Sequence, residues 1–229
     1  LRLRVRGSVP VTYHVEYTIG TTVLRWDDFK DIGNKGPLTF AGAYPKNAVD
    51  NDNCFYILRA ANPDLLIAPT VTVAKGEPVR LAFRHVMHRL VVNLSGNALT
   101  ADELSQASVR LSESLYCCAV VDFTNATALA DNSAIYGDNP PTRTGATTTF
   151  ILVPQDIHSL SEKITITAGG QELTYTFPAQ LPGATAYDPP RRLQSGRTLT
   201  LNLAINTANR SAAASAKPST RATTTDDAA

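Results

Sequence analysis

Two histidines are the first residues whose spacing could support chemistry. His85 and His88 stand three positions apart, as in a metal pair on a helix. The residues from Pro78 to His85, however, alternate between apolar and polar side chains, which is the period of a half-buried β-strand. Positions three apart on a strand face opposite sides, so one ion could join them only across a bend. We therefore expect an inward, hydrogen-bonded His85 and a surface His88.

Clustered acidic side chains are the second candidate, because Ca²⁺ prefers oxygen ligands. Asp27 and Asp28 lie close to Asp31 in the sequence, and Asp50 begins the run Asp-Asn-Asp-Asn. That run lacks the glycine and the closing glutamate of an EF-hand loop. We interpret both clusters as solvated polar turns, with a calcium site as the weaker alternative.

The three cysteines, Cys54, Cys117 and Cys118, are odd in number, which argues against a disulfide scaffold. Neighbouring residues on a strand point to opposite faces, and this argues against a bridge between Cys117 and Cys118. A single bridge from Cys54 to either of them stays open. Two of the three are expected to act as small core residues.

The motifs of the common catalytic and nucleotide-binding sites do not occur in the sequence. It holds no Gly-x-Ser-x-Gly elbow, no phosphate-binding glycine loop and no His-Glu-x-x-His. No clustered pair of carboxylates favours a glycoside hydrolase. We therefore predict that the protein is not an enzyme and that it has no catalytic, cofactor-binding or metal-binding residues.

The composition excludes further classes of function. The 229 residues carry a formal net charge of +1, which offers no electrostatic footprint for nucleic acid. No stretch approaches the ~20 apolar residues that a transmembrane helix needs. Residues 1–6 alternate between apolar and basic side chains, unlike the apolar run of a signal peptide, so we expect a mature or trimmed product.

Runs of apolar residues that are typical of β-strands recur along the whole chain. They cover residues 1–17 with a break at 7–10, and residues 21–26, 38–44, 54–58, 65–73, 79–85, 87–94, 108–111, 115–123, 147–153, 163–168, 171–177 and 198–205. Between two of these runs, Gly169-Gly170 predicts a tight hairpin. The one helical signal is a capping box, in which Thr100 precedes Glu103 by three residues.

This succession of short strands predicts an all-β fold of the sandwich type. The break at Ser95-Gly96-Asn97 suggests two tandem sandwich domains, at residues 1–95 and 96–206. Residues 124–146 are expected to form a long loop. Residues 207–229 lack apolar periodicity, and we expect them to be a disordered tail.

Several of these segments, in this order, resemble the fimbrillin family of Bacteroidales, whose members are also called type V pilins. The similarity spans about residues 20–206 and rests on short stretches of sequence. These are Trp26 with Leu38-Thr39-Phe40-Ala41-Gly42-Ala43-Tyr44-Pro45 (the family's Trp…Phe-x-Ala-Tyr-x-Pro), Pro63-Asp64-Leu65-Leu66-Ile67-Ala68 (its Asp-Leu-Leu-x-Ala), residues 79–92 (its Phe-x-His strand pair), Phe150-Ile151-Leu152-Val153-Pro154-Gln155 (its Val-Pro-Gln strand end) and residues 193–203 (its last strand).

The resemblance implies two transthyretin-like β-sandwiches in tandem, in a lipoprotein exported to the outer membrane and the cell surface. It also implies that an arginine-directed protease removes an N-terminal strand, for which Arg2, Arg4 or Arg6 is the expected place. The groove opened in this way would accept a strand from the next subunit. The segment after Asn206 lacks the alternating large side chains of a donated strand, which favours a terminal, tip or accessory subunit over a shaft subunit.

Two functions therefore stay open. The first is a structural or tip-type fimbrial subunit that supports adhesion, with residues 1–17 as the exchange region and residues 79–94 as core. Its partners would be other fimbrial subunits and a surface glycan or protein. The alternative is a surface module that binds carbohydrate or protein without polymerising, through Tyr136, Asp138 and Pro140-Pro141 of the expected loop.

Overall fold

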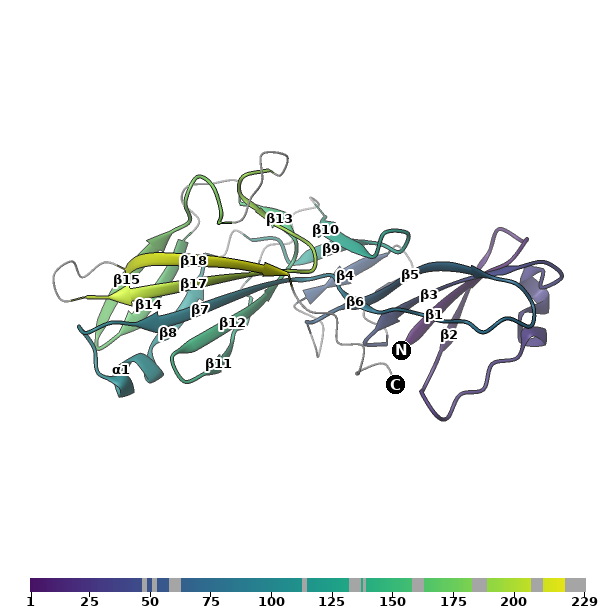
Figure 1. The fold of residues 1–229 in the computed structure, drawn as a ribbon, viewed down its shortest axis with the longest axis horizontal. Coiled ribbons are helices and arrows are strands. Elements are labelled where there is room, and N and C mark those ends of the chain that lie inside the picture. Colours follow the sequence, from purple (N-terminus) through teal and green to yellow (C-terminus); the bar gives the residue numbers. More distant parts are fainter. Residues whose placement is uncertain are drawn as a thin grey trace.

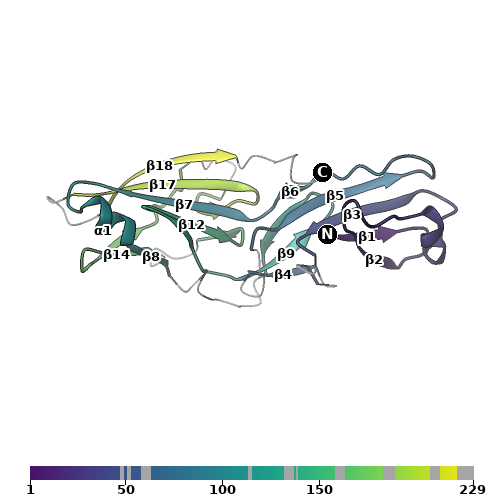
Figure 2. The same cartoon turned by 90° about the horizontal axis from the view of Figure 1, so that it is seen from below.

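The computed structural model describes residues 1–46, 49–50, 53–57, 63–112, 115–131, 137, 139–157, 163–182, 189–206 and 212–220. The molecule is elongated, and two β-rich lobes follow each other along its long axis (Figures 1 and 2). The expectation of an all-β fold is confirmed, because strands dominate the described residues.

The lobe that holds the N-terminus contains two antiparallel sheets and a short 3₁₀ helix, η1 (Trp26–Ile32). The five-stranded N-terminal sheet has the order β2-β1-β3-β5-β6 and consists of β1 (Arg2–Arg6), β2 (Thr12–Glu16), β3 (Leu38–Tyr44), β5 (Leu66–Val73) and β6 (Arg84–His85). The junction sheet, near the middle of the molecule, has the order β10-β9-β4 and consists of β4 (Cys54–Tyr56), β9 (Cys118–Asp122) and β10 (Thr127–Ala130).

The second lobe pairs a five-stranded sheet, of order β11-β12-β7-β17-β18, with a three-stranded sheet, of order β15-β14-β8. The larger sheet consists of β7 (His88–Ser95), β11 (Thr142–Thr144), β12 (Thr147–Leu152), β17 (Arg197–Ile205) and β18 (Ala212–Thr220). The smaller consists of β8 (Ser108–Leu111), β14 (Lys163–Ala168) and β15 (Gln171–Thr176). Helix α1 (Ala101–Gln106) and the pair β13 (Gln155–Asp156) and β16 (Arg192–Leu193) complete the lobe.

Alternation of apolar and polar residues builds these layers, because it gives each strand one face for a core. The core of the second lobe lies between its two sheets and includes Leu90, Phe150 and Ile164. A second core joins the N-terminal sheet to the junction sheet and includes Ile67 and Phe55. A third core, treated below, lies over β1 and β3.

Two local predictions are confirmed by backbone geometry. Gly169 and Gly170 have φ values of 56° and 73° and join β14 to β15 as a two-residue hairpin, a conformation that glycine adopts without steric cost. The capping box also forms, because the Glu103 N–H donates to Thr100 Oγ1 and the Thr100 N–H donates to Glu103 Oε2.

The predicted strand at residues 79–85 is wrong over most of its length. Only Arg84 and His85 pair with β5, although exposure still alternates along the preceding residues. The residues of β5 that follow its paired residues Leu66 and Ile67 explain the difference. Pro69 has no N–H to donate to a ladder, and the Thr70 N–H donates to the carbonyl of Phe123 at 2.8 Å.

The prediction of a surface His88 is also wrong, because its side chain is buried and its Nδ1 lies 3.0 Å from the carbonyl oxygen of Gln194. Val86 and Met87 form a bend between β6 and β7, which resets the alternation so that both histidines turn inward. His85 is half-buried, and its Nδ1 lies 3.0 Å from Asp64 Oδ1, in agreement with the expectation. The two histidines therefore have separate partners.

The predicted strand at residues 21–26 is absent, and the chain there enters η1. Asp28, in the first turn, caps the start of this helix, since the Arg25 N–H donates to its carboxylate at 2.7 Å. Asp27 forms an exposed ion pair of 3.7 Å with Lys75. Both side chains thus have structural roles. Of the run that begins at Asp50, residues 51–52 lie outside the described part of the chain.

Two segments predicted to be irregular contain strands. Residues 212–220 form β18, which pairs along its whole length with β17, so the prediction of a disordered tail is wrong for that segment. Residues 207–211 and 221–229 lie outside the described residues. Apolar periodicity did not reveal β18, because an edge strand can be held through backbone hydrogen bonds to its neighbour. The expected loop 124–146 likewise holds β10 and β11.

Strand pairing crosses the expected domain border at residue 95. β7 lies in the sheet of the second lobe, between β12 and β17, while β9 of the later sequence pairs with β4 of the first lobe. The division into residues 1–95 and 96–206 therefore stays a prediction. β7 precedes β9 in the sequence, yet β7 lies in the second lobe and β9 pairs with a strand of the first. A division into two domains therefore cannot be made by a single cut in the chain.

Candidate functional site: the first strand between a groove and a pocket

Strand β1 is held on both of its edges. Each of its five residues has a partner in β2 and another in β3, so that Leu3 faces Val15 on one side and Gly42 on the other. The Tyr17 N–H donates to the Leu1 carbonyl at 2.8 Å and prolongs the ladder. Loss of β1 would therefore leave two strands with unpaired backbone groups.

The apolar face of β1 belongs to the third core. Leu3 and Val5 are buried there with Phe29 and Phe40, whose rings meet edge to face with centroids 6.0 Å apart. Such aromatic contacts add to the stabilisation that burial alone provides. The first strand therefore contributes side chains to a core as well as backbone bonds to a sheet.

This core opens into a groove of about 500 Å³ lined mainly by apolar side chains. Leu3 and Phe40 lie at the groove together with Trp26, while Leu81 and Phe83 of the segment that precedes β6 also line it. Trp26 is fixed by a hydrogen bond of 2.8 Å from its Nε1 to the carbonyl of Asn34. The arrangement offers space beside β1 for further apolar side chains.

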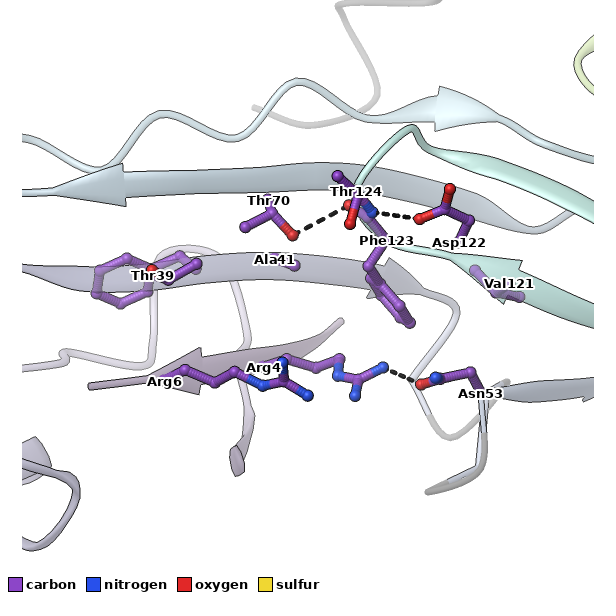
Figure 3. Close-up of a pocket in the computed structure, with 11 residues that line it drawn as sticks. Arg4, Arg6, Thr39, Ala41, Asn53, Thr70, Val121, Asp122, Phe123 and Thr124 are labelled. Carbon is purple, nitrogen blue, oxygen red and sulfur yellow. Dashed lines mark hydrogen bonds between the residues drawn. The ribbon is translucent and has the colours of Figure 1, made fainter. Parts of the chain in front are cut away.

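The other face of β1 lines a smaller, polar pocket of about 270 Å³ (Figure 3). There the Arg4 guanidinium donates to Asn53 Oδ1 and lies over the ring of Phe123, 4.4 Å from its centroid. Arg6 lines the same side, and Asp122 lies at the end of β9, on the opposite wall (Figure 3). The pocket thus presents two arginines and one carboxylate to solvent.

The surroundings of this face of β1 lower the pKa of two groups, His14 and Asp122. Desolvation lowers the pKa of His14, and the positive charges of Arg2, Arg4 and Arg6 lower it further. The Nδ1 atom of His14 is buried and has no hydrogen-bond partner among the described residues. In the pocket, hydrogen bonds from the Asn125 side chain and the Thr124 N–H lower the pKa of Asp122, so this carboxylate is charged at neutral pH.

The expected exchange region, residues 1–17, therefore forms the centre of this site, as β1, β2 and their connection. Of the alternative contact surface, Tyr136 and Asp138 lie outside the described residues, and Pro140 is exposed away from the lining of both hollows. Sequence reasoning missed the groove, because its walls come from separate segments. The alternation of Leu81 and Phe83 was the one visible signal.

An almost wholly β fold of packed sheets, with hollows along one strand, defines a protein of the β-sandwich class. A family model described as Fimbrillin-like matches residues 32–226. The chain therefore belongs to the fimbrillin-like family, and this membership supports a fimbrial-subunit role at the cell surface. In the part of the chain that the structure describes, no helix has the length and apolar character to cross a membrane.

Solved structures agree with this assignment at the level of the fold. A protein assigned to cell adhesion from Bacteroides uniformis has a TM-score of 0.65 and 16% identity, covering 82% of this chain and 74% of its own. One from Bacteroides ovatus has a TM-score of 0.62 and 17% identity, with coverages of 96% and 87%. A fimbrial assembly protein from Parabacteroides distasonis has a TM-score of 0.50 and 12% identity, with coverages of 96% and 86%. The search of curated proteins finds no match.

Proposed function

We propose that the chain is a structural or accessory subunit of fimbriae in which, after proteolytic trimming, a strand from another subunit replaces β1 and so supports adhesion. The observation that carries this proposal is the position of β1. It pairs on both sides, with β2 and with β3, and it lies beside an apolar groove. A strand with these properties can be exchanged for one from another chain, with the same backbone bonds.

The place of trimming follows from exposure. Arg6 is exposed and ends β1, and the next residues up to Pro10 are largely exposed as well. Arg6 is the last paired residue of β1 and borders the exposed connection, whereas Arg2 and Arg4 are each followed by further paired residues, where a protease has less access to the backbone. Cleavage after Arg6 would separate the whole of β1 from the rest of the chain.

The driving force for replacement comes from what removal of β1 exposes. Loss of the buried Leu3 and Val5 side chains withdraws roughly 1.5–3 kcal/mol of burial free energy each, at the usual value for such residues. The edges of β2 and β3 would in addition lose their ladder partners. An incoming strand with two large apolar residues at the same spacing would restore both contributions.

Residues 212–220 are poorly suited to be that donor. Their sequence, Ala-Ala-Ala-Ser-Ala-Lys-Pro-Ser-Thr, has no large apolar side chain, and these residues already pair with β17 as β18. This combination supports a subunit that receives a strand without giving one from this segment. A terminal or accessory position fits such a subunit better than a position within the shaft.

The test uses a chain that begins at Gly7 and a labelled peptide of residues 1–6. We expect the peptide to bind and to raise the Tm of the shortened chain, because it refills the gap between β2 and β3. The control peptide carries Leu3→Asp and Val5→Asp, and it should neither bind nor stabilise. If both peptides fail while the second lobe stays folded, the exchange site does not exist, and a non-polymerising surface module becomes the better interpretation.

A second experiment treats the full chain with an Arg-specific protease and follows its mass by light scattering and its bands on boiled and unboiled gels. Cleavage after Arg6 is expected, and Arg6→Lys should prevent it while keeping the positive charge. Detergent-resistant ladders of the trimmed chain alone would assign it to the shaft. A trimmed chain that stays monomeric alone yet binds the peptide would assign it to an accessory position.

A further inference from the structure

The junction sheet carries two of the three cysteines on the face that points away from the core. On its inner face, Phe55 and Ala119 are packed in the second core. Cys54 and Cys118 alternate with these residues on β4 and β9, so their side chains leave the sheet on the opposite side. Val120, which shares this outer face, is 45% exposed. Filling of the core therefore does not explain these two thiols.

A carboxylate completes the cluster. Asp131 directly follows β10, and its N–H donates to the carbonyl of Cys118 at 2.9 Å, which fixes it beside the thiols. One ligand atom from each of Cys54, Cys118 and Asp131 lies within 4.8 Å of the others. Cys118 is buried, while Cys54 and Asp131 are half-buried and leave a path from solvent.

We propose that Cys54, Cys118 and Asp131 bind a thiophilic divalent cation, with Zn²⁺ as the best match. Two thiolates and one carboxylate are ligands that zinc accepts, and the fourth position of a tetrahedral site is then open to water. With Zn–S distances of about 2.3 Å, two sulfurs in a tetrahedral site lie about 3.8 Å apart.

Tyr56 provides an outer contact to this site. It lies directly opposite Cys118 in the β4–β9 ladder, and its hydroxyl donates a hydrogen bond to the Cys118 sulfur. Donors of this kind orient metal ligands and commonly change metal affinity by about 10- to 100-fold. Tyr56 is therefore expected to be a positioning residue rather than a ligand.

The strand register argues against a disulfide as the explanation for the pair. Cys54 lies opposite Val120, and Cys118 opposite Tyr56, so the two cysteines are diagonal neighbours. Diagonal positions of an antiparallel pair are about 7–8 Å apart. Disulfides rarely form beyond about 7 Å between Cα atoms. The two cysteines are present as thiols and not as a disulfide.

Metal ions bind the thiolate form of cysteine, so binding of the ion displaces protons from the ligand thiols.

The experiment uses the untagged full chain, treated with a chelator and kept reduced, with Co²⁺ and Zn²⁺ as probes. We expect one ion per chain in native mass spectra, a thiolate-to-cobalt charge-transfer band, and loss of that band when Zn²⁺ is added. Cys54→Ser, at a half-buried position, should abolish the band without loss of fold, and Cys118→Ser should do the same. Tyr56→Phe should weaken binding about tenfold.

Cys117→Ala is the matched control, because Cys117 is buried in the second core on the inner face of the junction sheet and should leave the cobalt band unchanged. The proposal is overturned if the reduced chain binds no ion, or if the Cys54→Ser and Cys118→Ser chains bind as tightly as the original. It is also overturned if only the Cys117 substitution removes binding.

Discussion

The guanidinium of Arg4 lies 4.4 Å from the centre of the Phe123 ring, so a cation–π contact ties β1 to the turn between β9 and β10. Arg4 also bonds to Asn53, which precedes β4. The Arg4 side chain therefore fastens the first strand to two segments at the junction sheet. This connection couples the strand proposed for exchange to the middle of the molecule.

Arg4→Ala should lower the free energy of unfolding by about 1–2 kcal/mol, because a half-buried cation–π contact and a hydrogen bond are lost together. Chemical denaturation measures the effect. Arg6→Ala, on the same face but exposed, is the control and should change stability by less than about 0.5 kcal/mol. An equal loss from both substitutions would contradict a specific role for the contacts of Arg4 with Phe123 and Asn53.

Ser195→Ala should be destabilising by about 1–3 kcal/mol, because it leaves two backbone groups without partners. The Ser195 hydroxyl donates to the Val86 carbonyl at 2.8 Å and accepts from the Ala128 N–H at 3.1 Å. It thus joins the segment before β17 to the bend before β7 and to β10. Urea unfolding measures the loss, and the exposed Ser105→Ala should be nearly neutral. A neutral Ser195→Ala would contradict this role.

His14 predicts the pH dependence of stability. Its pKa is lowered in the folded protein, so the folded state binds the proton less well than the unfolded chain does. Stability from this group is complete above the unfolded pKa of about 6.5 and is lost as the pH falls through the lower folded pKa.

The fall in Tm from neutral pH toward pH 5 should therefore be smaller for His14→Gln than for the original chain. Tyr13→Phe, at an exposed neighbour on β2, should keep the original slope. Unchanged pH profiles for both variants would remove His14 from this explanation.

Gly96→Ala should be more destabilising than Gly76→Ala by about 1–3 kcal/mol, the usual range for overpacking. Both glycines have positive φ values, 133° and 93°, so both substitutions carry backbone strain. Of the two positions, only Gly96 is one where the added Cβ would clash with another atom, the carbonyl oxygen of Ile205. Equal Tm losses in the two variants would mean that the chain relaxes around Gly96 without cost.

Local sequence patterns predicted the strands and turns well where residues close in the sequence determine the backbone conformation. The hairpin at Gly169-Gly170 and the capping box at Thr100 are of this kind. Pairing partners were not predictable. Whether residues 79–83 pair with β5 depends on Pro69 and Phe123, which are distant in sequence. β18 was missed for the same reason, since a neighbouring strand holds it and its own side chains gave no signal.

The candidate sites show the same limit. The arginines of β1 and the exchange region were visible in the sequence, whereas the groove needs Trp26 and Phe83 to meet across the fold. Cys54 and Cys118 are 64 positions apart, and only the β4–β9 register puts them on one face. Rules that search for metal ligands at short spacings in the sequence do not detect such a pair.

The parallel pairing of β7 with β17 has a mechanical consequence. Both strands run along the long axis of the molecule, and seven residue pairs hold them together from Arg89–Thr198 to Ser95–Ala204. A tensile load applied along that axis would shear this ladder, so its hydrogen bonds would have to break together rather than one after another. Residues just before and within β7, Met87 and Leu90, lie in the cores of different lobes. Tension transmitted between the lobes would therefore pass through the strand that is best placed to resist it.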